Sequence, residues 1–197
     1  QYVRVLASYT DKGNFSNSQI SAATSVITDV NDAPSGSLTI SGSATENQTL
    51  SATANLSDPD NNGAAISGMT YQWEQADSAN GTWQAIADAT RTTFTPGNAQ
   101  VGKYLRVTVS YVDTGGNRGG YSNSFSSAAT DAVQNINDKP IGTVSVRDLN
   151  DAAPNYTQNA VLKASNNLQD ADGMGTVSYK WQNSANGTDW NDISGAN

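Results

Sequence analysis

The sequence has no cysteine and no histidine among its 197 residues. Without cysteine no disulfide can stabilise the chain, and zinc sites lose the thiolate and imidazole ligands that they normally use. The absence of both residues also excludes the familiar Cys–His and Ser–His–Asp catalytic arrangements. Hard cations remain compatible with this composition, because they bind the oxygen atoms of carboxylates, amides and carbonyl groups.

Positive charge and long apolar runs are also scarce. The chain has 10 Lys and Arg residues against 18 Asp and Glu residues, which gives a net charge of −8. This balance argues against a nucleic-acid-binding surface, which needs a basic patch. No apolar run is long enough to span a bilayer, so we expect no membrane insertion in this segment. No signal peptide is visible and the first residue is not Met, so we expect a slice of a longer protein.

The chain instead repeats itself. QYVRVLASYTDKGN at 1–14 matches KYLRVTVSYVDTGGN at 103–117, and FSNSQISAATSVITDVNDAP at 15–34 matches YSNSFSSAATDAVQNINDKP at 121–140. Downstream, NLSDPD matches NLQDAD, and YQWEQADSANGTW matches YKWQNSANGTDW. A period of roughly a hundred residues predicts tandem structural modules.

The phase of this repeat predicts one complete module and two partial ones. Residues 1–28 form the C-terminal part of a preceding repeat, 35–134 a complete repeat and 141–197 the N-terminal part of a following repeat, with linkers at 29–34 and 135–140. Neither partial repeat has a counterpart of RTTFTPGNAQVG at 91–102. Because half a sandwich cannot bury its core alone, we expect a window cut from a longer array. The alternative is that the tail and front parts of different chains complement each other.

Within the complete repeat, short alternating stretches separated by turns predict an all-β fold. The stretch 103–113 is the clearest strand, because Leu105, Val107, Val109 and Tyr111 fall on one face. SANG at 78–81 is typical of a hairpin turn. Such spacing favours a two-sheet Greek-key β-sandwich. The predicted strands are 37–42, 49–56, 69–76, 82–87, 92–96, 103–113 and 125–135.

These stretches resemble a known class of repeats. Trp73 in the third strand, followed by NAQVGKYLRV, resembles the core tryptophan and the tyrosine corner of immunoglobulin-like domains. The joint DVNDAP resembles the cadherin linker D-x-N-D-N-A-P. The whole sequence is similar to tandem immunoglobulin-like and cadherin-like repeats of very large bacterial surface proteins. These proteins include calcium-dependent RTX-type adhesins exported by type I secretion. The resemblance implies an extracellular location on the bacterial cell surface and Ca²⁺ as the bound ion.

The topology of a sandwich predicts where acidic residues gather. The loop after the second strand, the loop before the last strand and the incoming linker lie at one end. We therefore expect Asp58, Asp60 and Asp113 to converge on the linker residues Asp29, Asn31 and Asp32. Carboxylates so close together repel unless a cation neutralises them, and Ca²⁺ accepts six to eight oxygen ligands.

A second ion site is expected at the next joint. The loop that contains Glu46 should lie at the opposite end of the sandwich, beside Asn137, Asp138, Asp170 and Asp172. Asn135 replaces the first acid of the joint, so this site has one negative charge fewer. The simpler alternative is that each N-D-x-P sequence is only a turn, since Asn, Asp and Pro are common turn residues.

The sequence thus predicts a structural extender segment of a long bacterial adhesin or filament, with calcium stiffening the joints. Its partners would be neighbouring repeats of the same chain, with host-cell or biofilm glycans and proteins bound through other domains, and lateral self-association into fibres.

The alternative is a ligand-binding adhesion module for a glycan, a protein or another copy, for which the loop GNRGGY at 116–121 is the candidate. Trp83 and Trp190 could stack on a sugar or pack beside the hairpin. An accessory module of a secreted hydrolase is a third reading. We expect no catalysis, because the acidic pairs recur with the repeat.

Overall fold

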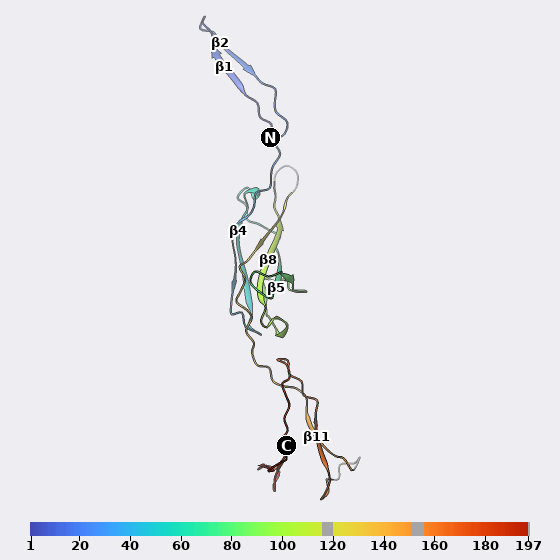
Figure 1. Cartoon of the computed structure of the whole chain (residues 1–197). Coiled ribbons are helices and arrows are strands. Elements are labelled where there is room, and N and C mark those ends of the chain that lie inside the picture. Colours follow the sequence, from blue (N-terminus) through green and yellow to red (C-terminus); the bar gives the residue numbers. More distant parts are fainter. Residues whose placement is uncertain (116–119, 151–155, 197) are drawn as a thin grey trace. The chain divides into compact units, whose positions relative to one another are not determined.

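The computed structural model describes residues 1–115, 120–150 and 156–196 (Figure 1). The described residues form short antiparallel strands and two three-residue 3₁₀ turns, so the predicted all-β class is confirmed. They divide into two compact units, Gln1–Gln134 and Asn135–Asn197. Among the described residues, no helix has the length and apolar character needed to cross a membrane.

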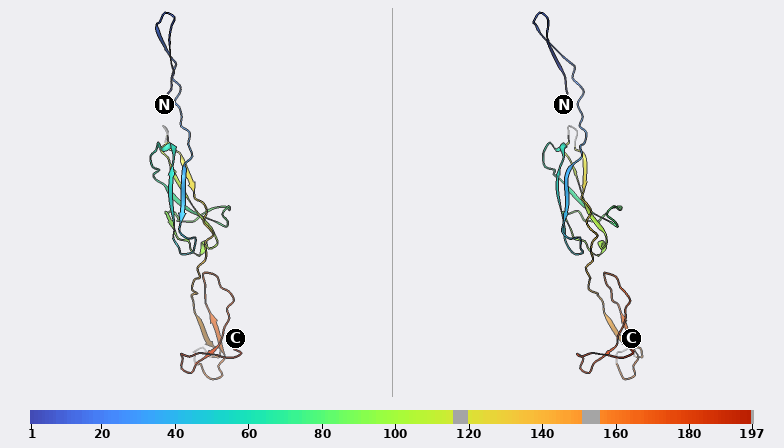
Figure 2. Two further views of the ribbon diagram at one scale, coloured as in Figure 1. Left: turned by 90° about the vertical axis from the view of Figure 1, so that its left-hand side faces the viewer. Right: turned by 60° about the vertical axis from the view of Figure 1, so that its left-hand side comes forward.

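The middle of the first unit is a sandwich of two sheets (Figure 2). One sheet has the order β3-β4-β7 and the other the order β6-β5-β8-β9. The chain therefore changes sheet after β4, after β6 and after β7, which confirms the predicted sandwich-like arrangement. The strands are β3 (Ser35–Ser41), β4 (Leu50–Ser57), β5 (Thr70–Ala76), β6 (Gln84–Ala85), β7 (Thr93–Phe94), β8 (Tyr104–Val112) and β9 (Ser122–Ser126).

Alternation along the strands builds the core between the two sheets. Trp73 is fully buried on β5, where its ring centroid lies 5.6 Å from that of Phe94 and its Nε1 donates to the carbonyl of Arg91 at 2.9 Å. On β8, alternate side chains point into the core, as the sequence predicts. The buried core contains Leu38, Leu50, Ile66, Trp73, Ala89, Leu105, Val107, Val109, Tyr111 and Val133.

The last predicted strand, 125–135, differs from the observed structure. Strand β9 ends at Ser126, and the following segment stays beside β8 through irregular pairs of hydrogen bonds. The hydroxyl of Ser127 accepts from the N–H of Val107, and the hydroxyl of Thr130 accepts from the N–H of Leu105, both at 3.1 Å. Side-chain oxygens thus replace the carbonyl groups that a regular strand would supply.

The N-terminal hairpin repeats this arrangement. Strands β1 (Leu6–Thr10) and β2 (Ser16–Ile20) pair with Tyr9 opposite Asn17, as Tyr111 pairs with Asn123 in the sandwich. Beyond β2, the hydroxyls of Ser21 and Thr24 accept N–H groups of Val5 and Val3, both at 3.1 Å. The hairpin therefore has the local structure of β8, β9 and the segment that follows them.

The second unit repeats the other part of the sandwich. Strands β10 (Val144–Asp148) and β11 (Leu162–Asn166) pair as β3 and β4 do, and β12 (Gln182–Asn183) and β13 (Asn191–Asp192) pair as β5 and β6 do. Residues with positive φ also recur at matching positions of the repeat, because Asn47 corresponds to Asn159 and Asp88 corresponds to Gly195. The boundaries of the repeats themselves stay a sequence prediction.

Candidate metal centre

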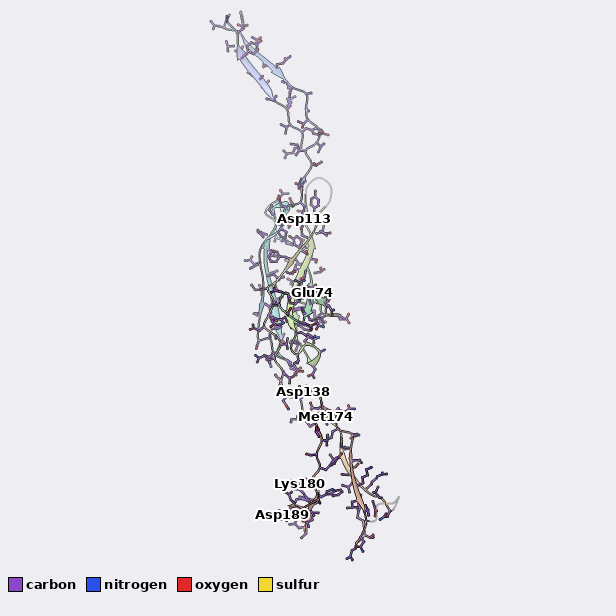
Figure 3. All side chains as sticks on the ribbon, in the orientation of Figure 1. Glu74, Asp113, Asp138, Met174, Lys180 and Asp189 are labelled. Carbon is purple, nitrogen blue, oxygen red and sulfur yellow. The ribbon has the colours of Figure 1, made fainter. Side chains whose placement is uncertain are left out.

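Two loops bring three aspartates together at one end of the sandwich. Asp58 follows β4 and caps the 3₁₀ turn η1 (Pro59–Asn61), where its Oδ1 accepts the N–H of Asp60 at 3.0 Å. Asp113 comes directly after β8 (Figure 3). Carboxylate oxygens of Asp58, Asp60 and Asp113 all lie within 4.8 Å of one another, and no residue of the three is more than 8% exposed.

Asp113 is held in place by donors from the loop and from β9. Its Oδ1 accepts the N–H groups of Gly115 and Tyr121, both at 2.8 Å, and its Oδ2 accepts from the Asn123 amide at 2.7 Å. Burial alone would raise the pKa of Asp113, but these hydrogen bonds outweigh burial and leave the pKa below its ordinary value. The side chain is therefore a preformed anion.

Asp58 has a different set of donors. The Tyr111 hydroxyl donates to its Oδ2 at 2.6 Å, and the Asn123 amide lies 3.4 Å from the same atom. Burial, this hydrogen bond and the negative charges of Asp58, Asp113 and Asp60 all raise the pKa of Tyr111. Tyr111 thus remains a neutral donor toward the acidic group.

The linker contacts this group mainly through its backbone. The N–H of Asp32 donates to Asp60 Oδ2 at 2.7 Å, and the carbonyl of Asp29 accepts from the Tyr121 hydroxyl at 3.0 Å. The Asn31 amide donates to Asn123 Oδ1 at 3.3 Å. The side chains of Asp29 and Asp32 are exposed, and neither carboxylate belongs to the group formed by Asp58, Asp60 and Asp113. The linker is tied to the centre, but by different atoms from those that the sequence suggests.

The second joint has the same backbone geometry within its own unit. The N–H of Asp138 donates to Asp172 Oδ2 at 2.7 Å, and the N–H of Asp172 donates to Asp170 Oδ1 at 3.0 Å. Asn137 donates to the carbonyl of Asp138 at 2.9 Å. Glu46 is buried in the first unit, where its N–H donates to the carbonyl of Gln134 at 2.8 Å. The expected meeting of Glu46 with the second joint stays a prediction.

Sequence reasoning missed two supporting residues of the site, Tyr111 and Asn123, although the repeat contains the signal for them. Tyr111 and Asn123 recur in the hairpin as Tyr9 and Asn17, because SYVD matches SYTD and YSNS matches FSNS. The counterpart of Asp113 is Asp11, whose Oδ1 accepts from Gly13 at 2.9 Å and from Phe15 at 3.0 Å. Hydrogen bonds, chiefly the one from Phe15, lower the pKa of Asp11 as well. The same anion-holding turn therefore occurs twice.

The arrangement can hold a metal ion. Its donors are oxygen atoms, and the chain has no histidine or cysteine, so a hard cation suits the site better than a transition metal does. The loop at 116–121 is the sequence candidate for ligand binding, and residues 116–119 of this loop lie outside the described residues.

Residues 40–131 match the model of a family described as a domain of unknown function (DUF8696). This range extends from within β3 to the segment after β9 and includes the three buried aspartates. It includes neither joint. The comparison with curated proteins gives no match.

Proposed function

We propose that this chain is a structural extender segment of a long bacterial cell-surface adhesin or filament, in which Ca²⁺ at each joint stiffens successive β-sandwich repeats. The observation that carries the proposal is the hydrogen bond from the Asp32 N–H to Asp60, one of the three buried carboxylates. Through this contact, whatever fixes the acidic group also fixes the linker.

Calcium is the cation that fits this group best. Three carboxylates with little access to water repel one another, and a divalent cation removes that repulsion. Calcium takes six to eight oxygen ligands in flexible geometry, and loops rich in carboxylates, amides and carbonyls can supply them. Magnesium requires a stricter octahedron and keeps more of its water.

The mechanism is mechanical. A cation between η1 and the loop after β8 would hold both loops and, through Asp60, the incoming chain at residues 29–34. The equivalent contact of Asp138 with Asp172 supports the same device at the second joint. An array of such modules would project a terminal binding domain away from the cell surface.

The ligand-binding alternative has less support among the described residues. The Arg106 guanidinium lies 4.5 Å from the Trp83 ring centroid, and Arg106 Nε donates to Glu74 at 2.6 Å. The Trp83 ring therefore packs against its own sheet, which favours packing over sugar stacking at this position.

Thermal unfolding of the whole chain with calcium and with chelator tests the proposal. A ligand that binds only the folded state stabilises it by about 2.7 kcal/mol at a hundredfold excess over Kd. For a domain of this size, we expect the first unit to melt roughly 10 °C higher with calcium. Asp58→Asn with Asp60→Asn should abolish the increase. Asp131→Asn, which changes an exposed acid of the same sandwich, should preserve it. An equal melting temperature with calcium and with chelator would refute the proposal.

A further inference from the structure

The two loops that carry the acidic group are also joined to each other by uncharged groups. Asn61 is the last residue of η1 and follows Asp60. Thr114 follows Asp113 in the loop after β8. The side-chain Oδ1 of Asn61 accepts the N–H of Thr114 at 2.9 Å and the Thr114 hydroxyl at 3.1 Å. We call this contact the Asn61–Thr114 latch, and it needs no ion, because both donors and the acceptor belong to the chain.

The latch is built around a buried acceptor. Asn61 is 4% exposed, so its amide oxygen is shielded from water and depends on Thr114 for donors. The Thr114 hydroxyl also lies 3.4 Å from the carbonyl oxygen of Asp60. A buried polar group that loses its partner destabilises the folded state, so separating these loops is unfavourable. The latch therefore keeps Asp60 and Asp113 near each other through the residues that directly follow them.

Electrostatic repulsion acts between the same two loops in the opposite sense. The carboxylates of Asp58 and Asp60 lie on the η1 side and that of Asp113 on the other, all with little access to water. Their mutual repulsion favours separation of the loops when no ion is bound. The latch opposes that separation with neutral hydrogen bonds. An ion that meets loops already at the right spacing does not have to assemble them, and a preorganised site binds its ligand more tightly.

Neither residue of the latch recurs in the other copies of the repeat within this chain. The counterpart of Asn61 is Gly173, which has no side chain, and the counterpart of Thr114 is Lys12, which has no hydroxyl. The aspartate before each of these positions is present in both copies. The acids thus belong to the repeat, whereas the latch belongs to the complete repeat at 35–134. A contact that the fold itself required would be expected in every copy, so the latch points to a property of this one site.

We propose that the Asn61–Thr114 latch sets the calcium concentration at which the joint at 29–34 stiffens, by holding the two acid-bearing loops together before the ion binds. This inference rests on the calcium centre proposed above. Asn61 and Thr114 are positioning residues, because they act through the placement of the neighbouring aspartates. The linker is affected through Asp60, whose Oδ2 accepts the N–H of Asp32 at 2.7 Å.

Amide hydrogen exchange of the whole chain over a series of free calcium concentrations tests the proposal. Protection of the peptide covering 29–34 should rise with calcium, and its midpoint reports the affinity of the first site. Asn61→Ala removes the acceptor, and Thr114→Val removes the hydroxyl but keeps the shape of the side chain. Both should raise the midpoint, by about two- to tenfold for the loss of one hydrogen bond. Thr114→Ser keeps the hydroxyl and should keep the midpoint, and the midpoint at 135–140 should stay the same in every variant.

Two further comparisons separate positioning from general stability. Thr39→Val removes the hydroxyl of another exposed threonine, which donates to the carbonyl of Thr53 at 3.4 Å, and it should leave the midpoint unchanged. In chelator, Asn61→Ala should speed exchange in the peptide covering 58–64, because the loops then open without an ion. Equal midpoints in the unmodified chain and both latch variants, or the same shift with Thr39→Val, would overturn the latch and leave the calcium centre standing. An unmodified chain without any calcium-dependent protection would refute the calcium centre, and the latch proposal with it.

Discussion

The side-chain amide of Asn123 donates to Asp113 and accepts from Asn31, and it lies near Asp58 as well. It therefore connects the acidic group with the linker. The sequence identifies the acids, because carboxylates in paired loops predict a cation site. The recurrence of Asn123 as Asn17 marks the position, but the local pattern is that of a polar strand residue. Only the folded sandwich shows that the Asn123 amide contacts the acidic group and the linker.

The substitution Tyr111→Phe tests whether the hydroxyl of this core residue stabilises the acidic group. The change removes the hydroxyl that donates to buried Asp58 and leaves the packing of the ring in place. We expect the free energy of unfolding in chelator to fall by about 1–2 kcal/mol, because the carboxylate loses a donor. Denaturant titration measures this loss. Tyr9→Phe at the equivalent hairpin position, where the side chain is 62% exposed, should have little effect. Equal losses in both variants would contradict the assigned role.

The lowered pKa of Asp113 predicts how the stability of the fold depends on pH in acid. Its pKa in the folded protein lies below the ordinary 3.8, because hydrogen bonds from Tyr121, Gly115 and Asn123 outweigh burial. The stability that it contributes is therefore present above that ordinary value and is lost as the pH falls through the lower folded value. In chelator, Asp113→Asn should unfold with a shallower pH dependence below about pH 4 than the unmodified chain. Stability measured by denaturant melts at a series of pH values checks this, and parallel curves would refute it.

Among the elements, strand β8 was predicted almost to the residue, whereas the last strand was not. The alternation of Leu105, Val107 and Val109 is a strong signal of period two, and it reflects burial that the structure confirms. The segment after β9 instead uses the hydroxyls of Ser127 and Thr130 as acceptors. Propensity and periodicity describe backbone pairing, so they do not reveal where a side chain replaces a carbonyl group.

The pairing of β3 with β4 depends on glycine at one position. Gly36 has φ of +121°, and a Cβ there would lie 2.2 Å from the carbonyl oxygen of Asn55. Gly36→Ala should therefore lower the free energy of unfolding by about 1–3 kcal/mol or more, since strain is added and the strands must separate. Calorimetry measures the decrease. Gly97→Ala, at a φ of −115° with no atom within 4 Å of the added Cβ, should change stability little. An equally mild effect at Gly36 would disprove this requirement.

At the scale of the whole molecule, the two joints should respond to calcium independently. The N–H of Asp32 donates to Asp60, and the N–H of Asp138 donates to Asp172. If calcium fixes these carboxylates, amide hydrogen exchange should slow in the peptides covering 29–34 and 135–140, because opening of the joint then requires loss of the ion. Mass spectrometry of deuterium uptake measures both joints in one sample.

Two single substitutions make this test specific. Asp60→Asn should remove the calcium effect at 29–34 and leave it at 135–140, and Asp172→Asn should do the reverse, because each acid accepts the backbone N–H of only its own joint. Protection lost at both joints from either change would mean that calcium acts on the fold as a whole. Protection at neither joint in the unmodified chain would mean that the repeated N-D-x-P sequences are turns without an ion, and the stiffening proposed for the array would lose its basis.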